Sequence, residues 1–185
     1  MTREGSGTFL IEAAMMALKK PVGISRKFDM EAWNILDKDE IENIKKKSLE
    51  YYDEERTIDI AGSDINPEVV NFAKKHIVQA GLSNRIFVKS MDLNNIILDD
   101  KEGCFIVNPP YGERLSNKKS IQYLYKDLGK LLVRHPGWGM AIISNDNNFE
   151  KHFGKRATKK RRVYNGVMEC NVYIYNPIVQ NKKHL

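Results

Sequence analysis

The alternation of strand-like and helix-like segments between residues 57 and 143 constrains the fold of this chain most. Short apolar runs typical of strands occupy residues 57–62, 86–88, 104–107 and 140–143. Segments with a helical pattern occupy residues 66–80 and 120–134. Because strands joined through helices pair in parallel and carry helices on their faces, this order predicts an α/β fold with a mainly parallel sheet.

Local sequence features support the individual helices. Residues 66–68 (Asn-Pro-Glu) have the order of a helix start, with a capping side chain before a proline and an acid, and Gly81 ends that helix. Residues 9–18 predict an apolar helix, and residues 37–52 an amphipathic surface helix. The helix of residues 120–134 is predicted to turn these side chains inward: Ile121, Leu124, Tyr125, Leu128, Leu131 and Leu132.

The C-terminal part predicts a β-hairpin. Residues 162–164 and 167–175 form strands, the second with alternating apolar and polar side chains, and Asn165-Gly166 between them is a strong indication of a tight turn. No internal repeat or linker interrupts the chain. We therefore expect one domain over residues 1–185, with a parallel sheet that ends in an antiparallel hairpin.

The composition is that of a soluble globular protein, with 42% hydrophobic and 29% charged residues among 185. No apolar run approaches the length of a membrane span, and no signal-peptide pattern opens the chain, so a cytoplasmic location is the default expectation. Cys104 and Cys170 lie far apart, and neither they nor the four histidines have the spacing of metal ligands. Cys104, within an apolar strand, is expected to be a buried, reduced thiol.

Basic residues are concentrated near the C-terminus of a chain whose net charge is +6. Such a cluster suits contacts with the phosphates of a nucleic acid, although a solvated loop would explain it nearly as well. Its members are Lys151, Lys155, Arg156, Lys159, Lys160, Arg161 and Arg162.

The tetrapeptide Asn108-Pro109-Pro110-Tyr111 directly follows a predicted strand. The Asn108 side-chain oxygen and the Pro109 carbonyl, whose direction the next proline restricts, are two acceptors that can hold an exocyclic NH2 group. Tyr111 can stack on the base that carries this group. These four residues are the candidate catalytic set, and a Pro-Pro turn that merely closes the strand is the structural alternative.

Polar residues at three other positions suggest a cofactor site at the carboxyl ends of the strands. The turn of residues 5–8 (Gly5, Ser6, Gly7 and Thr8) would let a carboxylate or phosphate approach helix N-terminal amides closely. Asp64, followed by Ile65, can accept hydrogen bonds from ribose hydroxyls. Asp92 can accept from an adenine amino group while Met91 packs on its ring. Chance glycines and helix-capping aspartates are the alternatives.

Five sequence blocks resemble one known family. They are GSGTFLIEAAMMA, GSDINPEVVNFAKKHIVQAGL, NPPYGERL, LYKDLG and YNGVMECNVYIYN. Together they are similar to the bacterial large-subunit (23S) rRNA guanine-N2 methyltransferases, THUMP-containing proteins often labelled N6-adenine-specific DNA methylases. The resemblance covers nearly the whole chain.

This resemblance implies a Rossmann-like class I methyltransferase fold with S-adenosylmethionine as methyl donor. It implies that Gly5 and Gly7 line the methionine end, that Asp64 binds ribose and that Asp92 binds adenine. It further implies that the target base is held by Asn108, which also belongs to the cofactor set, with Pro109 and Tyr111. Glu113 and Arg114 would sit at the same mouth, or form a local salt bridge.

The start of the chain departs from the family pattern. Family members carry an acidic strand end before the glycines, as in D-P-x-C-G-S-G-T, where this chain has Met1-Thr2-Arg3-Glu4. We expect the first strand of the sheet and the THUMP domain to be missing. Neighbouring strand edges would then be exposed, which favours pairing with a second chain in a homodimer.

Three functional hypotheses follow. The first is S-adenosylmethionine-dependent methylation of an exocyclic amine in RNA, with guanine N2 of large-subunit rRNA as the expected target. The second is N6-adenine methylation of DNA, which the Asn-Pro-Pro-Tyr motif also permits. The third is a non-catalytic RNA-binding module that retains the fold.

Overall fold

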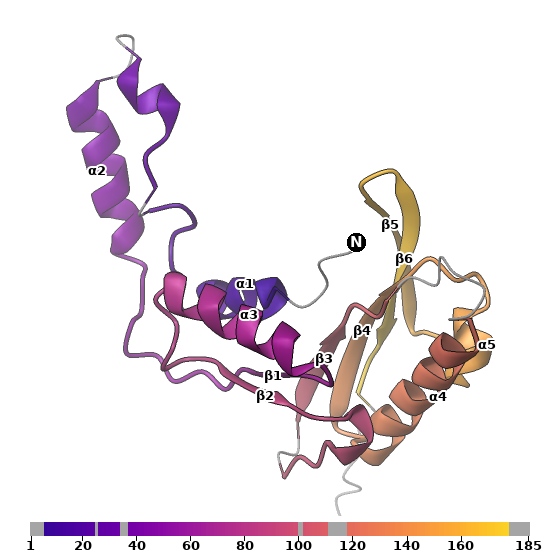
Figure 1. Ribbon diagram of the computed structural model, residues 1–185. Helices are drawn as coiled ribbons and strands as arrows, with labels where there is room; N and C mark the ends of the chain where they lie inside the picture. Colours follow the sequence, from indigo (N-terminus) through magenta and orange to yellow (C-terminus); the bar gives the residue numbers. More distant parts are fainter. Residues whose placement is uncertain (1–5, 25, 34–36, 100–101, 111–117, 178–185) are drawn as a thin grey trace, which may run out of the picture. The chain divides into compact units, whose positions relative to one another are not determined.

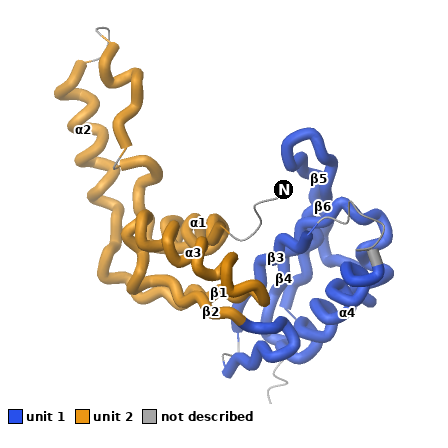
Figure 2. Tube along the Cα trace, in the orientation of Figure 1, with its two compact units in different colours: residues 1–4, 91–185 blue, residues 5–90 orange. Residues whose placement is uncertain are grey.

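The structure is a computed structural model that describes residues 6–24, 26–33, 37–99, 102–110 and 118–177. It divides into two compact units, residues 5–90 and the remainder of the chain (Figure 2). Each unit is described by itself below. Within the described residues, no helix is long and apolar enough to cross a membrane.

The unit of residues 5–90 packs two helices against a pair of parallel strands (Figure 1). Strand β1 pairs with β2 from Ala61 opposite Phe87 to Asp64 opposite Ser90. The buried core is Ala14, Leu18, Val70, Ala73, Ile77, Leu82, Ile86 and Val88. The elements are α1 (Thr8–Ala17), a 3₁₀ helix (Asp29–Ala32), α2 (Lys38–Leu49), β1 (Ala61–Asp64), α3 (Pro67–Gln79) and β2 (Phe87–Ser90).

Capping confirms the predicted α3, whereas β1 is shorter than predicted. The Asn66 side chain accepts a hydrogen bond from the Glu68 amide at 2.9 Å, and Gly81 follows the helix with a φ of 68°. Strand β1 begins at Ala61 rather than at residue 57 because its partner β2 begins at Phe87, opposite Ala61. Of the residues before Ala61, Ile60 still accepts a hydrogen bond from the Phe87 amide at 3.0 Å.

The second unit contains a four-stranded sheet in the order β3-β4-β6-β5 (Figure 1). Strand β3 runs parallel to β4, while β6 is antiparallel to both β4 and β5. This confirms a parallel arrangement that ends in an antiparallel hairpin. The elements are a 3₁₀ helix (Leu93–Asn95), β3 (Gly103–Val107), α4 (Lys118–Arg134), β4 (Trp138–Ser144), α5 (Phe149–Phe153), β5 (Lys159–Asn165) and β6 (Met168–Tyr175).

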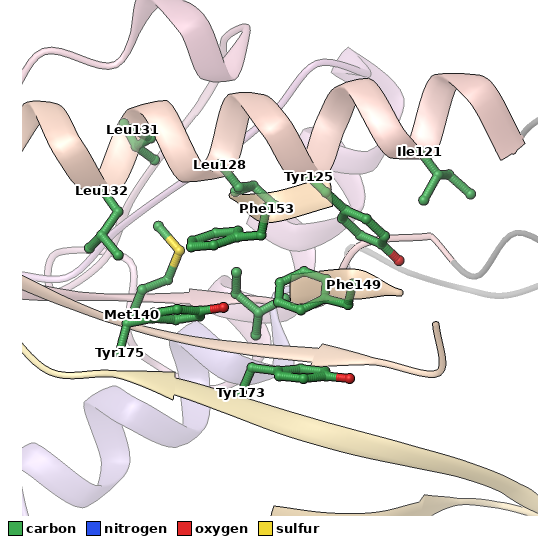
Figure 3. Close-up of a cluster of buried hydrophobic side chains, with 11 residues drawn as sticks. Ile121, Tyr125, Leu128, Leu131, Leu132, Met140, Phe149, Phe153, Tyr173 and Tyr175 are labelled. Atoms are coloured by element: carbon green, nitrogen blue, oxygen red, sulfur yellow. The ribbon is translucent and has the colours of Figure 1, made fainter. Parts of the chain in front are cut away.

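Aromatic side chains form much of the core between α4 and this sheet (Figure 3). The rings of Phe149 and Phe153, both on α5, lie 4.4 Å from those of Tyr173 and Tyr175 respectively. The inward face of α4 is as predicted. Helix α5 is not predicted, because five residues are too few for a helical period to be recognised. The core is Ile121, Tyr125, Leu128, Leu131, Leu132, Met140, Ile142, Phe149, Phe153, Tyr173 and Tyr175.

The expectation of a buried Cys104 thiol is wrong. Cys104 is exposed and Cys170 is the buried cysteine. Strand β3 is the outermost strand of the described sheet, and its side chains alternate between two faces. Phe105 packs against the core cluster, whereas Cys104 and Ile106, which is 53% exposed, belong to the opposite face. An apolar run therefore did not indicate burial on both faces.

The predicted hairpin is present, but its turn is displaced by one residue. Asn165 pairs with Met168, so the turn consists of Gly166 and Val167 rather than Asn165 and Gly166. Gly166 has a φ of 61°, which glycine adopts without steric cost. Strand β5 also begins at Lys159, three residues earlier than predicted. It therefore includes part of the basic cluster, for which a solvated loop was the alternative explanation.

Packing on α4 gives the first prediction. Leu131→Ala removes a side chain that is 1% exposed and should lower the free energy of unfolding by about 2–5 kcal/mol. Val133→Ala, at a position on the same helix that is 74% exposed, should change it by no more than about 0.5 kcal/mol. Urea unfolding followed by circular dichroism measures both, and similar losses would contradict the assigned inward face.

Candidate active site

The glycine turn at the start of α1 is sterically restricted. Gly7 precedes the helix with a φ of 75°, in the left-handed region. A Cβ atom on Gly7 would lie 3.2 Å from the Cβ of Ala73 on α3, within the same unit. Both the backbone conformation and the close approach to α3 therefore favour glycine at this position.

A histidine on α3 holds this turn. His76 Nδ1 lies 2.8 Å from the Ser6 carbonyl oxygen, and the Ser6 and Thr8 hydroxyl oxygens are 2.6 Å apart. His76 is one of the four histidines whose spacing in the sequence indicates no metal site. No local pattern could have identified this contact, because His76 and Ser6 are 70 residues apart in the chain.

Asp64 ends β1 and is half-buried. Its Oδ1 accepts a hydrogen bond from the Asn66 amide at 2.8 Å, which confirms a local turn-stabilising role for one carboxylate oxygen. Within the described residues, no hydrogen bond engages the other oxygen. The next residue, Ile65, is 71% exposed, and its carbonyl oxygen accepts from the Ser90 hydroxyl at 3.2 Å.

Asp92, in the second unit, has a similar local role. It caps the 3₁₀ helix Leu93–Asn95, and its Oδ1 accepts a hydrogen bond from the Asn94 amide at 2.7 Å. Met91 and Asp92 are both half-buried. The capping alternative is thus also present at this aspartate, while its second oxygen has no hydrogen bond among the described residues.

The Asn-Pro-Pro corner follows β3 directly. Asn108 is half-buried, Pro109 is buried and Pro110 is exposed. The corner in which the sequence predicts two acceptors thus contains one buried residue, Pro109. Four sequence-predicted site residues lie outside the described residues: Gly5, Tyr111, Glu113 and Arg114.

A buried hydroxyl pair lies at the end of the neighbouring strand β4. Ser144 is fully buried, and its Oγ is 2.9 Å from the Tyr125 hydroxyl oxygen and accepts from the Asp146 amide at 3.1 Å. Val107 pairs with Ile142, and Ser144 follows Ile142 by two residues, as Pro109 follows Val107. Burial raises the pKa of Tyr125, so its hydroxyl stays protonated at neutral pH. The sequence pattern predicts Tyr125 only as a core residue and does not indicate Ser144.

Among the described residues, no group of three or more His, Cys, Asp or Glu side chains could hold a metal ion. Each unit, taken by itself, offers polar groups of another kind: the Ser6–Thr8 turn and the Asp64 carboxylate in residues 5–90, and the Asp92 carboxylate, Asn108 and the Tyr125–Ser144 hydroxyls in the other unit. Groups of these kinds suit hydrogen bonding to an organic ligand.

The chain matches the profile of a family described as RMKL-like, methyltransferase domain, over residues 4–174. It belongs to this family. The resemblance noted from the five sequence blocks is therefore confirmed, and so is the class of fold. Three features therefore lie within a methyltransferase domain: the glycine turn, the strand-end carboxylates and the Asn-Pro-Pro corner.

Individual proteins similar to this domain are longer than it. "Putative RNA methyltransferase YpsC" of Bacillus subtilis (strain 168) is 33% identical over 171 residues, which are 92% of this chain and 44% of that protein. Ribosomal RNA large subunit methyltransferase K/L of Shewanella loihica is 35% identical over 176 residues, 92% of this chain and 25% of its own.

A solved structure that is similar to this domain also belongs to a longer protein. The crystal structure of SMU.472 in complex with SAH is similar with a TM-score of 0.90 and 35% identity. The similarity covers 94% of this chain and 46% of that chain. The methyltransferase domain described here therefore spans less than half the length of these relatives.

The glycine turn gives the second prediction. Gly7→Ala and Gly154→Ala both place a side chain at a positive φ, which costs about 1–2 kcal/mol. Only Gly7→Ala also presses against Ala73, since nothing lies within 4 Å of a Cβ at Gly154. Thermal unfolding should therefore show a larger loss for Gly7→Ala, and equal losses would contradict the close approach.

The hydroxyl pair gives the third prediction. Tyr125→Phe removes one partner of the buried Ser144 hydroxyl and should lower the free energy of unfolding by about 1–3 kcal/mol. Tyr123→Phe is the matched control, on the same helix at a position that is 68% exposed, and should change little. Urea unfolding of both variants measures the difference. Indistinguishable midpoints would show that the pair contributes nothing.

Proposed function

We propose that this domain transfers a methyl group from S-adenosylmethionine to an exocyclic amino group of a base in RNA, most specifically guanine N2 of large-subunit rRNA. The observation that carries the proposal is the Asn108-Pro109 corner at the carboxyl end of β3 in a member of a methyltransferase family. The names of the relatives, an RNA methyltransferase and an rRNA large-subunit methyltransferase, support RNA as the substrate.

The corner can hold an amine by two acceptors. The Asn108 side-chain oxygen and the Pro109 carbonyl would each accept a hydrogen bond from the NH2 group and direct the nitrogen lone pair away from them. The amine gains positive charge as it is methylated, so the same two acceptors stabilise the transition state. Tyr111, by family resemblance, would stack on the base.

The residues of the cofactor set fit S-adenosylmethionine by their chemistry. The turn at Gly7 leaves little room for a side chain, and Asp64 and Asp92 each retain a carboxylate oxygen to accept from a hydroxyl or an amino group. Exposed Ile65 and half-buried Met91 offer apolar surface to a purine. When bound, S-adenosylmethionine supplies a methyl group that is attached to a sulfonium sulfur. This sulfur is a good leaving group because it departs as a neutral thioether.

Positioning supplies most of the acceleration on this proposal. The protein must hold the amine in line with the methyl group, and a fixed geometry of this kind replaces the entropy loss of a bimolecular encounter. The base must also leave its stack or lie in a single-stranded region, which costs a few kcal/mol. A rigid corner that holds the base after this step offsets part of that cost.

We also propose a cytoplasmic location, where rRNA is the substrate, and a homodimer formed through strand edges. Within the described residues, β3 pairs with β4 alone and β1 with β2 alone. Each therefore has an edge to which another strand can add. Sedimentation of the chain over a range of concentrations tests self-association.

Replacement of Asn108 tests the function. Asn108→Ala should lower methyl transfer to rRNA by about 10²–10³-fold, the effect of removing one transition-state hydrogen bond, while the affinity for S-adenosylmethionine stays nearly unchanged. Asn71→Ala, an exposed asparagine on α3, is the control and should retain full activity. Tritiated methyl transfer and calorimetry with the cofactor measure the two quantities.

Each alternative predicts a different result. Undiminished rRNA methylation by Asn108→Ala would refute the proposed role of the corner. Transfer to duplex DNA in preference to rRNA would favour the N6-adenine methyltransferase. Saturable RNA binding without any binding of S-adenosylmethionine would favour the non-catalytic module.

A further inference from the structure

The β5–β6 hairpin extends past the end of β4 (Figure 1). Pairing between β4 and β6 ends where Ser144 meets Asn171, but pairing between β5 and β6 continues to Asn165 and Met168. Residues 163–170 therefore project beyond β4. We call β5 together with residues 166–170, that is residues 159–170, the basic arm.

The basic arm projects from the end of the sheet at which β3 leads into the Asn-Pro-Pro corner. Strands β3 and β4 are parallel, so their carboxyl ends share one edge, and the arm extends beyond the carboxyl end of β4. Arg162 pairs with Asn171, which pairs with Ser144, so these three residues form one row across the strands. Three strand spacings separate β3 from β5, about 14 Å.

Positive charge dominates the arm and the segment before it. Residues 151–167 contain seven Lys and Arg residues and no Asp or Glu, and all seven are exposed. Among the described residues, Arg162 alone of the seven forms an ion pair, with Glu169 at 3.2 Å. These two side chains are 68% and 52% exposed, so the pair is weak and does not neutralise the cluster.

Exposed apolar surface accompanies this charge. The register puts Lys160, Arg162 and Tyr164 on one face of β5. Lys160 lies over the ring of buried Tyr173 at 4.9 Å, whereas Tyr164, near the turn, is 67% exposed. Val167 in the turn is fully exposed. Tyr164 is therefore an exposed ring on the same face of β5 as Arg162, while Arg161 belongs to the opposite face.

Two explanations of these features can be compared. Lysine and arginine on an edge strand protect it from pairing with other sheets, which explains the charges of β5. That explanation does not account for Tyr164 and Val167, because an exposed aromatic ring and an exposed valine at the tip would promote association. A ligand that is both anionic and aromatic explains the two features together.

We propose that the basic arm binds single-stranded RNA beside the target base, with Tyr164 stacked on a neighbouring base and with Arg161 and Arg162 on phosphates. Single-stranded RNA combines a charged backbone with unstacked bases, which aromatic side chains bind without requiring one sequence. This inference rests on the proposed function for the identity of the target base. Its binding test does not require catalysis.

The test measures binding of a fluorescein-labelled, 20-nucleotide single-stranded RNA to the 185-residue chain by anisotropy, at several KCl concentrations. Tyr164→Ala should weaken binding by about 5- to 160-fold, the range expected for loss of one stacked base, without changing the salt dependence. The double variant Arg161→Gln/Arg162→Gln should weaken binding and reduce the slope of log affinity against log salt by about 1.4 in magnitude, for two phosphates.

Matched variants on other elements serve as controls. Tyr51→Ala removes a tyrosine that is 70% exposed, and Lys46→Gln/Lys47→Gln removes two exposed charges from α2. Neither should change RNA affinity by more than about twofold, on the assumption that only nearby charges act at 0.15 M salt. Unchanged thermal midpoints of all four variants establish that folding is intact.

The outcomes separate this inference from the proposed function. Selective loss of RNA binding in the arm variants supports the arm, even where no methyl transfer occurs. Failure of the wild-type chain to bind the RNA, equal losses in arm and control variants, or tighter arm-dependent binding of duplex DNA would each overturn it. Active methylation of rRNA together with unaffected RNA binding by the arm variants would retain the function and reject the arm.

Discussion

The parallel pairing of β3 with β4 is the constraint on which the candidate site of the second unit depends. It brings the Asn108-Pro109 corner and the end of β4 to the same edge of the sheet, with Val107 opposite Ile142. The aromatic core under β4 holds this edge from one face, because Tyr125 on α4 contacts both Phe149 and the Ser144 hydroxyl. The proposed grip on an amine by Asn108 and Pro109 requires a fixed backbone, and Pro109 is buried.

The two aspartates of the proposed cofactor set each have a local role in a turn. Asp64 and Asp92 each use Oδ1 to accept a backbone amide two residues later. This bond fixes the direction of the carboxylate, and the second oxygen then has a defined orientation without further contacts. Capping and ligand binding are therefore not exclusive alternatives at these aspartates, because the capping bond engages only one oxygen of each carboxylate.

The class of fold and most elements could be predicted because they depend on local patterns. The period of α4 identified its inward side chains, and the order Asn66-Pro67-Glu68 located the start of α3. The features that were missed depend on partners distant in sequence. The contact of His76 with the Ser6 carbonyl and the pairing of Tyr125 with Ser144 arise only from packing, and the exposure of Cys104 follows from the position of β3 at the edge of the described sheet.

The antiparallel insertion of β6 between β4 and β5 has a consequence for function. Since β6 is antiparallel to both neighbours, β5 runs in the same direction as β3 and β4. Its carboxyl end and the Gly166-Val167 turn therefore lie at the edge that bears the corner. If β6 had followed β5 through a helix and run parallel to it, the connection would have required a dozen or more residues. The loop that precedes such a strand, rather than a hairpin, would then lie at this edge. A two-residue turn instead projects a rigid, hydrogen-bonded pair of strands, and such a pair can carry charge and an aromatic ring without the entropy loss of ordering a loop.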